Sequence, residues 1–159
     1  MLLLRMEKLK NSLVSSSNMS SLRVSLVIPR GENGKFILAR RAVDKHPFPN
    51  TWVCGVGGKA DGNETFEEAA LREMFEEVGF SSPISKMGEF HYDNEFKADF
   101  VVFTTEKSLD VSSFKPDPAE IQFLKEFTID EIKSMISVNP NDFAPTFRVA
   151  LEEFVKNLD

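Results

Sequence analysis

The sequence predicts an α+β sandwich in which helices cover a mixed β-sheet. Short segments rich in β-branched and aromatic residues are interspersed with segments that repeat apolar residues at helical spacing, and the two kinds do not alternate strictly. The chain has 159 residues, of which 42% are hydrophobic. This size and composition suit one compact domain with a core of its own.

The first half of the chain is expected to contain three short strands. Residues 22–28 are β-branched and apolar, residues 31–34 have the composition of a turn, and residues 35–39 are expected to return as the second strand of a hairpin. A Pro-rich loop follows at residues 44–50, and a third strand is expected at residues 52–56.

The second half begins with a cluster of glycines, which is followed by a helix. Gly55, Gly57, Gly58 and Gly62 indicate a loop. Residues 66–78 then have helical periodicity, and the glycine that follows them occupies the C-cap position. The remaining elements are expected to be strands at 87–92, 98–105 and 121–127, a polar loop at 107–119, and helices at 130–135 and 145–158.

Residues 1–21 are expected to form a flexible N-terminal extension, and residues 22–159 the folded domain. The leucine run near the start is too short for the apolar region of a secretory signal. We therefore expect a cytoplasmic protein, although the basic, serine-rich composition of the extension leaves an organellar targeting peptide as the alternative. No apolar run in the sequence is long enough to span a bilayer, so no membrane partner is expected.

The net charge and the cysteine content exclude several classes of function. The formal net charge is −6, which argues against a protein that binds the phosphate backbone of a nucleic acid duplex, since such binding needs a basic face. A polyphosphate substrate remains compatible with this charge, because a bound divalent cation can supply positive charge locally. The single cysteine, Cys54, excludes an internal disulfide and a multi-cysteine zinc site.

The predicted helix at 66–78 carries acidic side chains on one face and apolar side chains on the other. On a helical wheel, Glu73, Glu76 and Glu77 fall within an arc of about 100°. These like-charge neighbours repel one another in an isolated helix, and a bound Mg²⁺ or Mn²⁺ would reverse that repulsion. A solvated acidic face is the alternative interpretation of the glutamates alone. The opposite, apolar arc of about 140° is expected to face the core. It consists of Ala70, Leu71, Met74, Phe75 and Val78.

These glutamates belong to a longer pattern. Gly58 is followed after five residues by Glu64 and, after seven more, by REMFEEVGF at residues 72–80. This spacing resembles the Nudix box at every defining position, and Pro49 and Trp52 are similar to the usual lead-in to that box. The resemblance to the Nudix hydrolase superfamily covers nearly all of the chain beyond the extension. It implies an α/β/α sandwich around a mixed sheet, in agreement with the fold class predicted above.

The resemblance also implies an activity, namely metal-dependent hydrolysis of a diphosphate linkage. The substrate is usually a nucleoside diphosphate joined to a further group X. Metal ions neutralise the charge of the diphosphate and activate a water molecule, while a carboxylate accepts the proton of that water. The resemblance implies Mg²⁺ as cofactor, or Mn²⁺, bound by Glu73, Glu76, Glu77 and the carbonyl of Gly57. One of these glutamates, or an acid further along the chain, is the base.

Other residues are implied to support this centre. Arg72 is expected to pair with a carboxylate of the box, with Glu64 behind it as a supporting group. Glu120 is the candidate for a further metal ligand, ahead of Asp117 and Glu95.

Arg40 and Arg41 close a predicted strand. They either contact the phosphates of the substrate or only make the strand end soluble.

Two rival activities are considered on the same fold. An isopentenyl-diphosphate isomerase, built on the same fold, carries a catalytic cysteine where this chain has Gly57. A catalytically silent Nudix-like module that binds a nucleotide or a protein usually lacks box glutamates that this chain retains.

Within the hydrolases, the chain differs from some enzymes that act on oxidised purine nucleotides, because Cys54 stands where those carry an asparagine. The expected partner is a small-molecule diphosphate, and a homodimer is left open.

Overall fold

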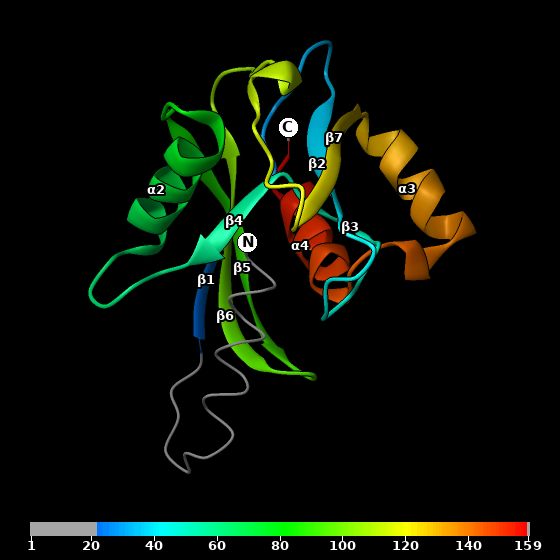
Figure 1. Ribbon diagram of the computed structural model, residues 1–159, viewed down its shortest axis with the longest axis horizontal. Coiled ribbons are helices and arrows are strands. Elements are labelled where there is room, and N and C mark those ends of the chain that lie inside the picture. The colour runs from blue at the N-terminus through cyan, green and yellow to red at the C-terminus, as the bar shows by residue number, and fades with distance from the viewer. Residues whose placement is uncertain (1–21, 159) are drawn as a thin grey trace.

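The computed structural model describes residues 22–158, which form two β-sheets and three α-helices (Figure 1). The predicted extension at residues 1–21 lies outside the described residues. The four-stranded sheet has the order β4-β1-β6-β5, from Val56–Lys59, Leu22–Val27, Lys97–Thr105 and Ile84–Asp93. The three-stranded sheet has the order β3-β2-β7, from Trp52–Cys54, Phe36–Arg41 and Ile121–Phe127. The helices are α2 (Phe66–Val78), α3 (Ile129–Val138) and α4 (Pro145–Lys156), with short 3₁₀ turns η1 (Val111–Ser113) and η2 (Pro140–Asp142).

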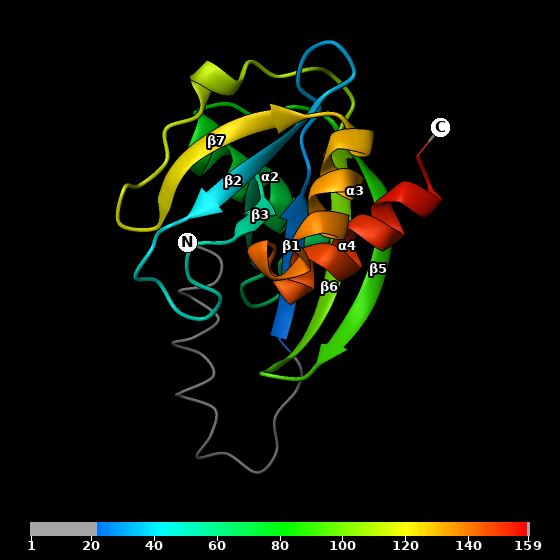
Figure 2. The ribbon, with the colours of Figure 1, turned by 90° about the vertical axis from the view of Figure 1, so that its right-hand side faces the viewer.

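The predicted α+β class is confirmed, and the larger sheet is mixed. Strand β1 runs parallel to β6 and antiparallel to β4. Helix α2 covers one face of this sheet, and α4 lies on its other side, towards the smaller sheet (Figures 1 and 2). Side chains of β1 alternate accordingly: Val24 and Leu26 belong to the core cluster that includes α4, and Val27 belongs to the cluster that includes α2. Both faces of β1 are therefore buried.

The prediction that residues 22–28 and 35–39 form a hairpin is wrong. Both edges of β1 are occupied by β4 and β6, and β2 pairs with β3 and β7 in the other sheet. The turn at 31–34 does form, since the amide of Gly31 donates to the carbonyl of Lys35 over 2.8 Å. The chain leaves the first sheet at Pro29, which has no N–H to continue the ladder. The turn thus joins two sheets rather than two neighbouring strands.

The strand expected at 52–56 is divided between the two sheets at Gly55. A Cβ at Gly55 would lie 2.8 Å from the carbonyl oxygen of Ile37 and 3.0 Å from Cδ of Pro29, so the backbone crosses here at close range. Part of the predicted glycine loop is consequently strand β4, where Gly57 and Gly58 pair with residues of β1. This division places the two glycines beneath helix α2.

The bounds predicted for α2 are confirmed, and local signals explain them. Thr65 and Glu68 form a capping box, in which the Glu68 amide donates to Thr65 Oγ1 (3.0 Å) and the Thr65 amide donates to Glu68 Oε1 (2.8 Å). Gly79 ends the helix with a φ of 88°, a conformation that favours glycine. Thr128 and Glu131 begin α3 in the same way. Helix α3 extends three residues beyond the predicted end at residue 135.

Candidate metal-binding and catalytic site

Helix α2 contacts the larger sheet through a stripe narrower than the predicted apolar arc. Ala70, Met74 and Val78 are buried at i, i+4 and i+8, whereas Phe75 is 59% exposed. The prediction that Phe75 faces the core is therefore wrong. Glu73, on the opposite side of the buried stripe from Phe75, packs against the sheet instead, and its side chain is 0% exposed. A carboxylate of the predicted acidic face is thus part of the interior.

The space for this buried carboxylate comes from Gly58 in β4. A Cβ at Gly58 would lie 2.2 Å from both Cδ and Oε1 of Glu73, a separation that real side chains do not adopt. Glycine at position 58 therefore lets Glu73 enter between helix and strand. Burying an ionised carboxylate is costly unless a positive charge compensates it.

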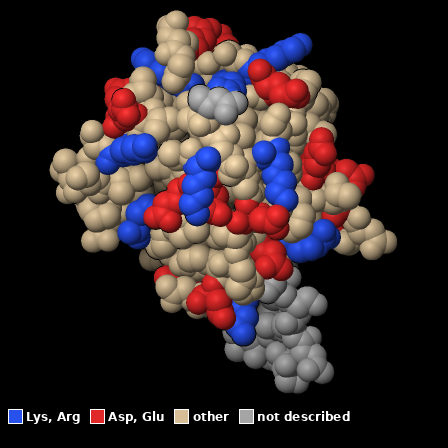
Figure 3. Space-filling model, turned by 180° about the vertical axis from the view of Figure 1, so that it is seen from behind, with Lys and Arg blue, Asp and Glu red and all other residues tan. Residues whose placement is uncertain are grey.

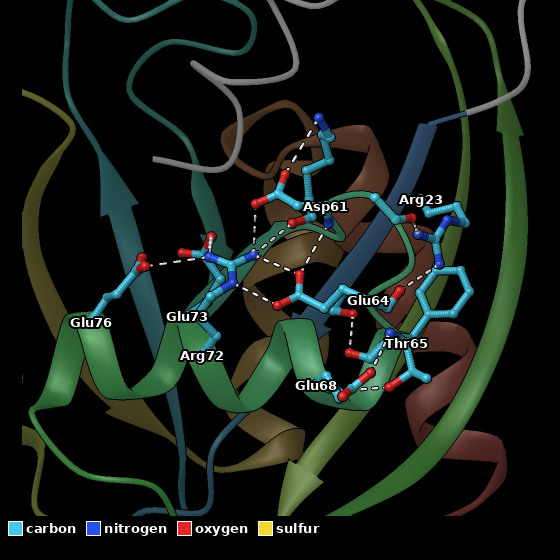
Figure 4. Close-up of polar contacts among 12 residues, drawn as sticks. Arg23, Asp61, Glu64, Thr65, Glu68, Arg72, Glu73 and Glu76 are labelled. Atoms are coloured by element: carbon cyan, nitrogen blue, oxygen red, sulfur yellow. Dashed lines mark hydrogen bonds and ion pairs between the residues drawn. The ribbon is translucent and has the colours of Figure 1, made fainter.

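Arg72 supplies that positive charge and joins four acidic side chains (Figure 4). Its Nη1 donates to Glu73 Oε1 over 3.1 Å and approaches Glu76 Oε1 at 3.4 Å. Its Nε and Nη2 donate to the two carboxylate oxygens of Glu64, over 2.7 and 2.9 Å. Nη2 also lies 3.4 Å from a carboxylate oxygen of Asp61. The bidentate contact to Glu64 has the planar geometry in which arginine binds carboxylates most strongly. The expected pairing of Arg72 with a box carboxylate is present, with Glu64 behind it.

The contact with Arg72 lowers the pKa of Glu64. The hydrogen bond from Arg72 is the largest cause that lowers the pKa of Glu64, from 4.5 to about 2, and the backbone amide of Asp61 adds to it. A pKa below its unfolded value means that the pairing stabilises the fold fully above pH 4.5. That contribution is lost as the pH falls from 4.5 towards 2.

We therefore expect the stability difference between the wild type and Glu64→Gln to depend on pH. Urea unfolding should give a large difference at pH 7 and a smaller one near pH 3, because Glu64 of the unfolded wild type becomes protonated below its pKa of 4.5 while the folded protein keeps the charge down to about pH 2. Glu67→Gln, at an exposed position in the first turn of α2, is the control and should show little change at either pH. A Glu64→Gln difference that stays constant from pH 7 to pH 3 would contradict this account.

The other predicted ligands lie at the C-terminal end of α2 and just before β7. Glu77 is half-buried and lines a small cavity together with Gly55, Phe114 and Ile121. The Glu77 carbonyl accepts a hydrogen bond from the amide of Lys115 (3.1 Å), which holds the loop before β7 against the helix. Glu120 is buried directly before β7, at 7% exposure. The predicted ligands are therefore drawn from α2, β4 and the loop before β7.

The two lesser candidates for a metal ligand are engaged elsewhere. Asp117 caps a turn by accepting from the amide of Ala119 (2.9 Å). Glu95 lies between β5 and β6 and accepts a hydrogen bond from the hydroxyl of Tyr92. Neither residue is among the partners of Arg72 described above.

The donor set suits a hard divalent cation, although its carboxylates do not surround a common point in the described residues. Within residues 22–158, no three His, Cys, Asp or Glu side chains already surround a common point that could hold a metal ion. Glu73, Glu76 and Glu77 nevertheless offer carboxylate oxygens from adjacent turns of one helix, and Gly57 adds a backbone carbonyl from β4. Oxygen donors of this kind suit Mg²⁺ and Mn²⁺.

The two consecutive arginines of β2 lie in different surroundings. Arg41 is 1% exposed and donates to the carbonyls of Lys45 (3.2 Å), His46 (3.0 Å) and Pro47 (2.8 Å). It therefore shapes the Pro-rich loop from within the protein, instead of meeting phosphates or solvent. Arg40 lies over the ring of Trp52, 5.2 Å from its centroid, and donates to Asp142 (2.8 Å).

One supporting residue was missed by the sequence analysis. Arg23 in β1 donates from Nη1 to the carbonyl of Glu64 and from Nη2 to the carbonyl of Gly62, each over 2.8 Å (Figure 4). No local pattern in the sequence links β1 to a loop about forty residues later. Cys54 is buried, and its burial raises the pKa of the thiol, so it is not a reactive nucleophile.

Two further properties concern the surface charge and the helices. On the face drawn in Figure 3, Lys and Arg side chains are interspersed with Asp and Glu side chains rather than gathered into one continuous stripe. Within the described residues, none of the helices combines the length and hydrophobicity that crossing a membrane requires.

Comparison with known sequences finds relatives that cover most of the chain. The prenyl-diphosphate phosphatase of Methanosarcina mazei is 24% identical over 136 residues, which cover 84% of this chain and 79% of that protein. The isopentenyl-diphosphate Delta-isomerase of Nocardia farcinica is 28% identical over 127 residues, which cover 75% of this chain and 70% of that protein.

Comparison with solved structures and with family models agrees with the fold. The structure of a MutT protein from Methanosarcina mazei Go1 aligns with a TM-score of 0.70 at 23% identity, over 89% of this chain and 97% of that one. This likeness shows a shared fold. A family model described as "NUDIX domain" matches residues 19–151. Because that match spans most of the sequence and includes the entire network around Arg72, the chain belongs to the NUDIX domain family and is a Nudix hydrolase.

Proposed function

We propose that this Nudix hydrolase is a metal-dependent enzyme that cleaves the diphosphate linkage of a small molecule, with a nucleoside diphosphate joined to a further group X as the expected substrate. The observation that carries the proposal is the buried Glu73 carboxylate, held between Gly58 and Arg72. A protein that used these glutamates only as a solvated surface would have no need to bury one of them at the cost of desolvation.

The proposed mechanism assigns a task to each part of the site. Glu73, Glu76 and Glu77 would hold Mg²⁺ or Mn²⁺ together with the carbonyl of Gly57. The bound metal supplies positive charge to the diphosphate and acidity to a water molecule. Arg72 places its positive charge beside Glu73 and fixes the orientation of that carboxylate, because its Nη1 donates to Oε1 of Glu73.

The base in this mechanism is a carboxylate that accepts the proton of the attacking water. Glu77 and Glu120 are the two candidates for this base. Glu77 lines the small cavity itself, and buried Glu120 directly precedes Ile121 in its wall. Either could take the proton, and Glu120 could instead complete the metal coordination.

A second candidate substrate is a prenyl diphosphate. The named activity of the Methanosarcina mazei relative is consistent with this choice. An isomerase is disfavoured, because Gly57 stands where the isomerases carry their catalytic cysteine and because Cys54 is buried.

A hydrolysis panel, run with and without metal, tests the proposal. The purified protein is incubated with Mg²⁺ or Mn²⁺ and, separately, with EDTA. The compounds are nucleoside triphosphates, ADP-ribose, nucleotide sugars, NADH, dinucleoside polyphosphates, and isopentenyl and longer prenyl diphosphates. We expect phosphate or nucleotide release that EDTA abolishes and added Mg²⁺ restores.

The other outcomes of this panel separate the alternatives. Formation of dimethylallyl diphosphate from isopentenyl diphosphate would establish an isomerase instead. Metal binding without turnover of any compound would establish a binding module. Turnover that persists in EDTA after dialysis would contradict metal dependence.

A further inference from the structure

Arg23 lies on β1, outside the loop and helix that carry the box pattern, yet it contacts both. Its two terminal nitrogens donate to the carbonyls of Glu64 and Gly62, each over 2.8 Å. Its guanidinium also lies 5.6 Å from the ring centroid of Phe66, the first residue of α2 (Figure 4). One side chain from the sheet thus holds the loop before α2 at two points and contacts the start of the helix.

We propose that Arg23 is a positioning residue for the metal-binding carboxylates, acting through Glu64 and Arg72. A series of direct contacts connects Arg23 to Glu73. Arg23 holds the main chain of Glu64, the Glu64 carboxylate binds Arg72 at two atoms, and Arg72 binds Glu73. This role rests on the proposed function, since it presumes that Glu73 binds a metal.

The geometry explains why the loop position matters. The Glu64 carboxylate reaches Arg72 at 2.7 and 2.9 Å, so a backbone shift of about 1 Å would break at least one of these hydrogen bonds. Gly62 has a φ of 53°, and apart from its chain neighbours no atom lies within 4 Å of its would-be Cβ, so no side chain packs against the loop on that side. Arg23 supplies the restraint that packing does not.

The fold itself does not depend on Arg23 alone, which makes the role testable. Other contacts fasten the same segment to β1: the Ala60 amide donates to the Arg23 carbonyl (2.8 Å), and Ser25 Oγ donates to the carbonyl of Phe66 (2.5 Å). Both persist when the Arg23 side chain is shortened. Water can replace the lost donors at the Gly62 carbonyl, since that contact is exposed.

The test compares Arg23→Gln with Arg30→Gln. Arg30 lies beyond the other end of β1 and makes contacts of the same kind, donating from Nε to the carbonyl of Thr105 (3.1 Å) and lying 5.5 Å from the ring centroid of Phe36. Mn²⁺ affinity is measured by electron paramagnetic resonance without substrate, and kcat and KM are measured on whichever compound the panel identifies. We expect Arg23→Gln to weaken Mn²⁺ binding and lower kcat by about 10- to 100-fold each, with a smaller change in KM. Arg30→Gln should change neither.

Two further variants show that the effect passes through Glu64. Arg23→Lys keeps the charge but has a single nitrogen for the two carbonyls, so it should restore Mn²⁺ affinity only in part and also serves if Arg23→Gln folds poorly. In a Glu64→Gln background, Arg23→Gln should add little to the loss, because the connection is already broken. Full additivity there, or equal Mn²⁺ affinity of Arg23→Gln and Arg30→Gln, would overturn the positioning role.

The binding measurement also separates this inference from the proposed function. Mn²⁺ binding that depends on Arg23, in a protein that hydrolyses none of the panel, would support the positioning role and overturn the hydrolysis. Failure of the wild type to bind Mn²⁺ or Mg²⁺ would overturn both.

Discussion

Replacing Glu73 by glutamine is expected to lower kcat by about a hundredfold or more, with a much smaller effect on KM. The carboxylate is buried between Gly58 and Arg72, so its charge is fixed in place before any substrate arrives. In the proposed mechanism that charge acts on the metal and on proton transfer, both of which matter most in the transition state. Steady-state kinetics on the substrate found by the panel measures the effect.

Glutamine keeps the volume of Glu73, so the packing of Met74 and Val78 should survive, and circular dichroism can confirm this. The variant should nevertheless be less stable than the wild type. Arg72 lies among four acidic side chains of the box, so its positive charge already offsets the repulsion between glutamates that the sequence predicts. Removing the Glu73 charge therefore removes an attraction. Glu67→Gln is the matched control, exposed on the same helix and expected to retain wild-type kinetics. Similar, small effects at both positions would contradict the catalytic assignment of Glu73 and leave it a structural partner of Arg72.

Local signals explain why α2 could be predicted to its exact bounds. Its start depends on Thr65 and Glu68, its end on Gly79, and all three act through hydrogen bonds or backbone angles within a few residues. The glutamate cluster was readable for the same reason, since helical periodicity alone brings it together.

The division into two sheets could not be predicted in this way. It depends on which strand edges remain available, and β1 is occupied on both sides by strands that follow 29 or more residues later. The buried state of Arg41 and Glu73 was missed for a related reason. Their hydrogen-bond partners are close in the sequence, since Arg72 is next to Glu73 and the carbonyls that Arg41 binds lie four to six residues after it. Their burial, however, depends on strands and loops that pack over them, as Gly58 of β4 does over Glu73, and this packing leaves no mark on the local pattern. Phe75 fell on the wrong side because an apolar arc of a helical wheel does not show how much of it the sheet can cover.

Gly58→Ala is expected to combine a loss of stability with a large loss of activity. The new methyl group would stand 2.2 Å from the Glu73 carboxylate, and that carboxylate is fully buried, so it has no solvent to move into. Either helix α2 shifts away from β4, or Glu73 leaves its contact with Arg72. Overpacking of this kind costs about 1–3 kcal/mol, which urea unfolding would detect. Misplacement of a catalytic carboxylate by about 1 Å lowers turnover by about a hundredfold, so kcat should fall further than stability alone explains.

Gly31→Ala is the matched control for this substitution, because its methyl group would also meet a glutamate, at 2.5 Å from Oε1 of Glu126. That carboxylate is the end of a half-buried side chain whose contact with the amide of Glu32 is exposed to solvent. It can swing aside, so stability should change by no more than about 0.5 kcal/mol and kcat should not change. The same added methyl group is thus expected to lower stability and kcat at position 58 and to leave both nearly unchanged at position 31, because only the Glu126 carboxylate is free to move. Equal behaviour of the two alanine variants would mean that Glu73 is not held in place by β4, and the site would then lose the preorganisation on which the proposed catalysis depends.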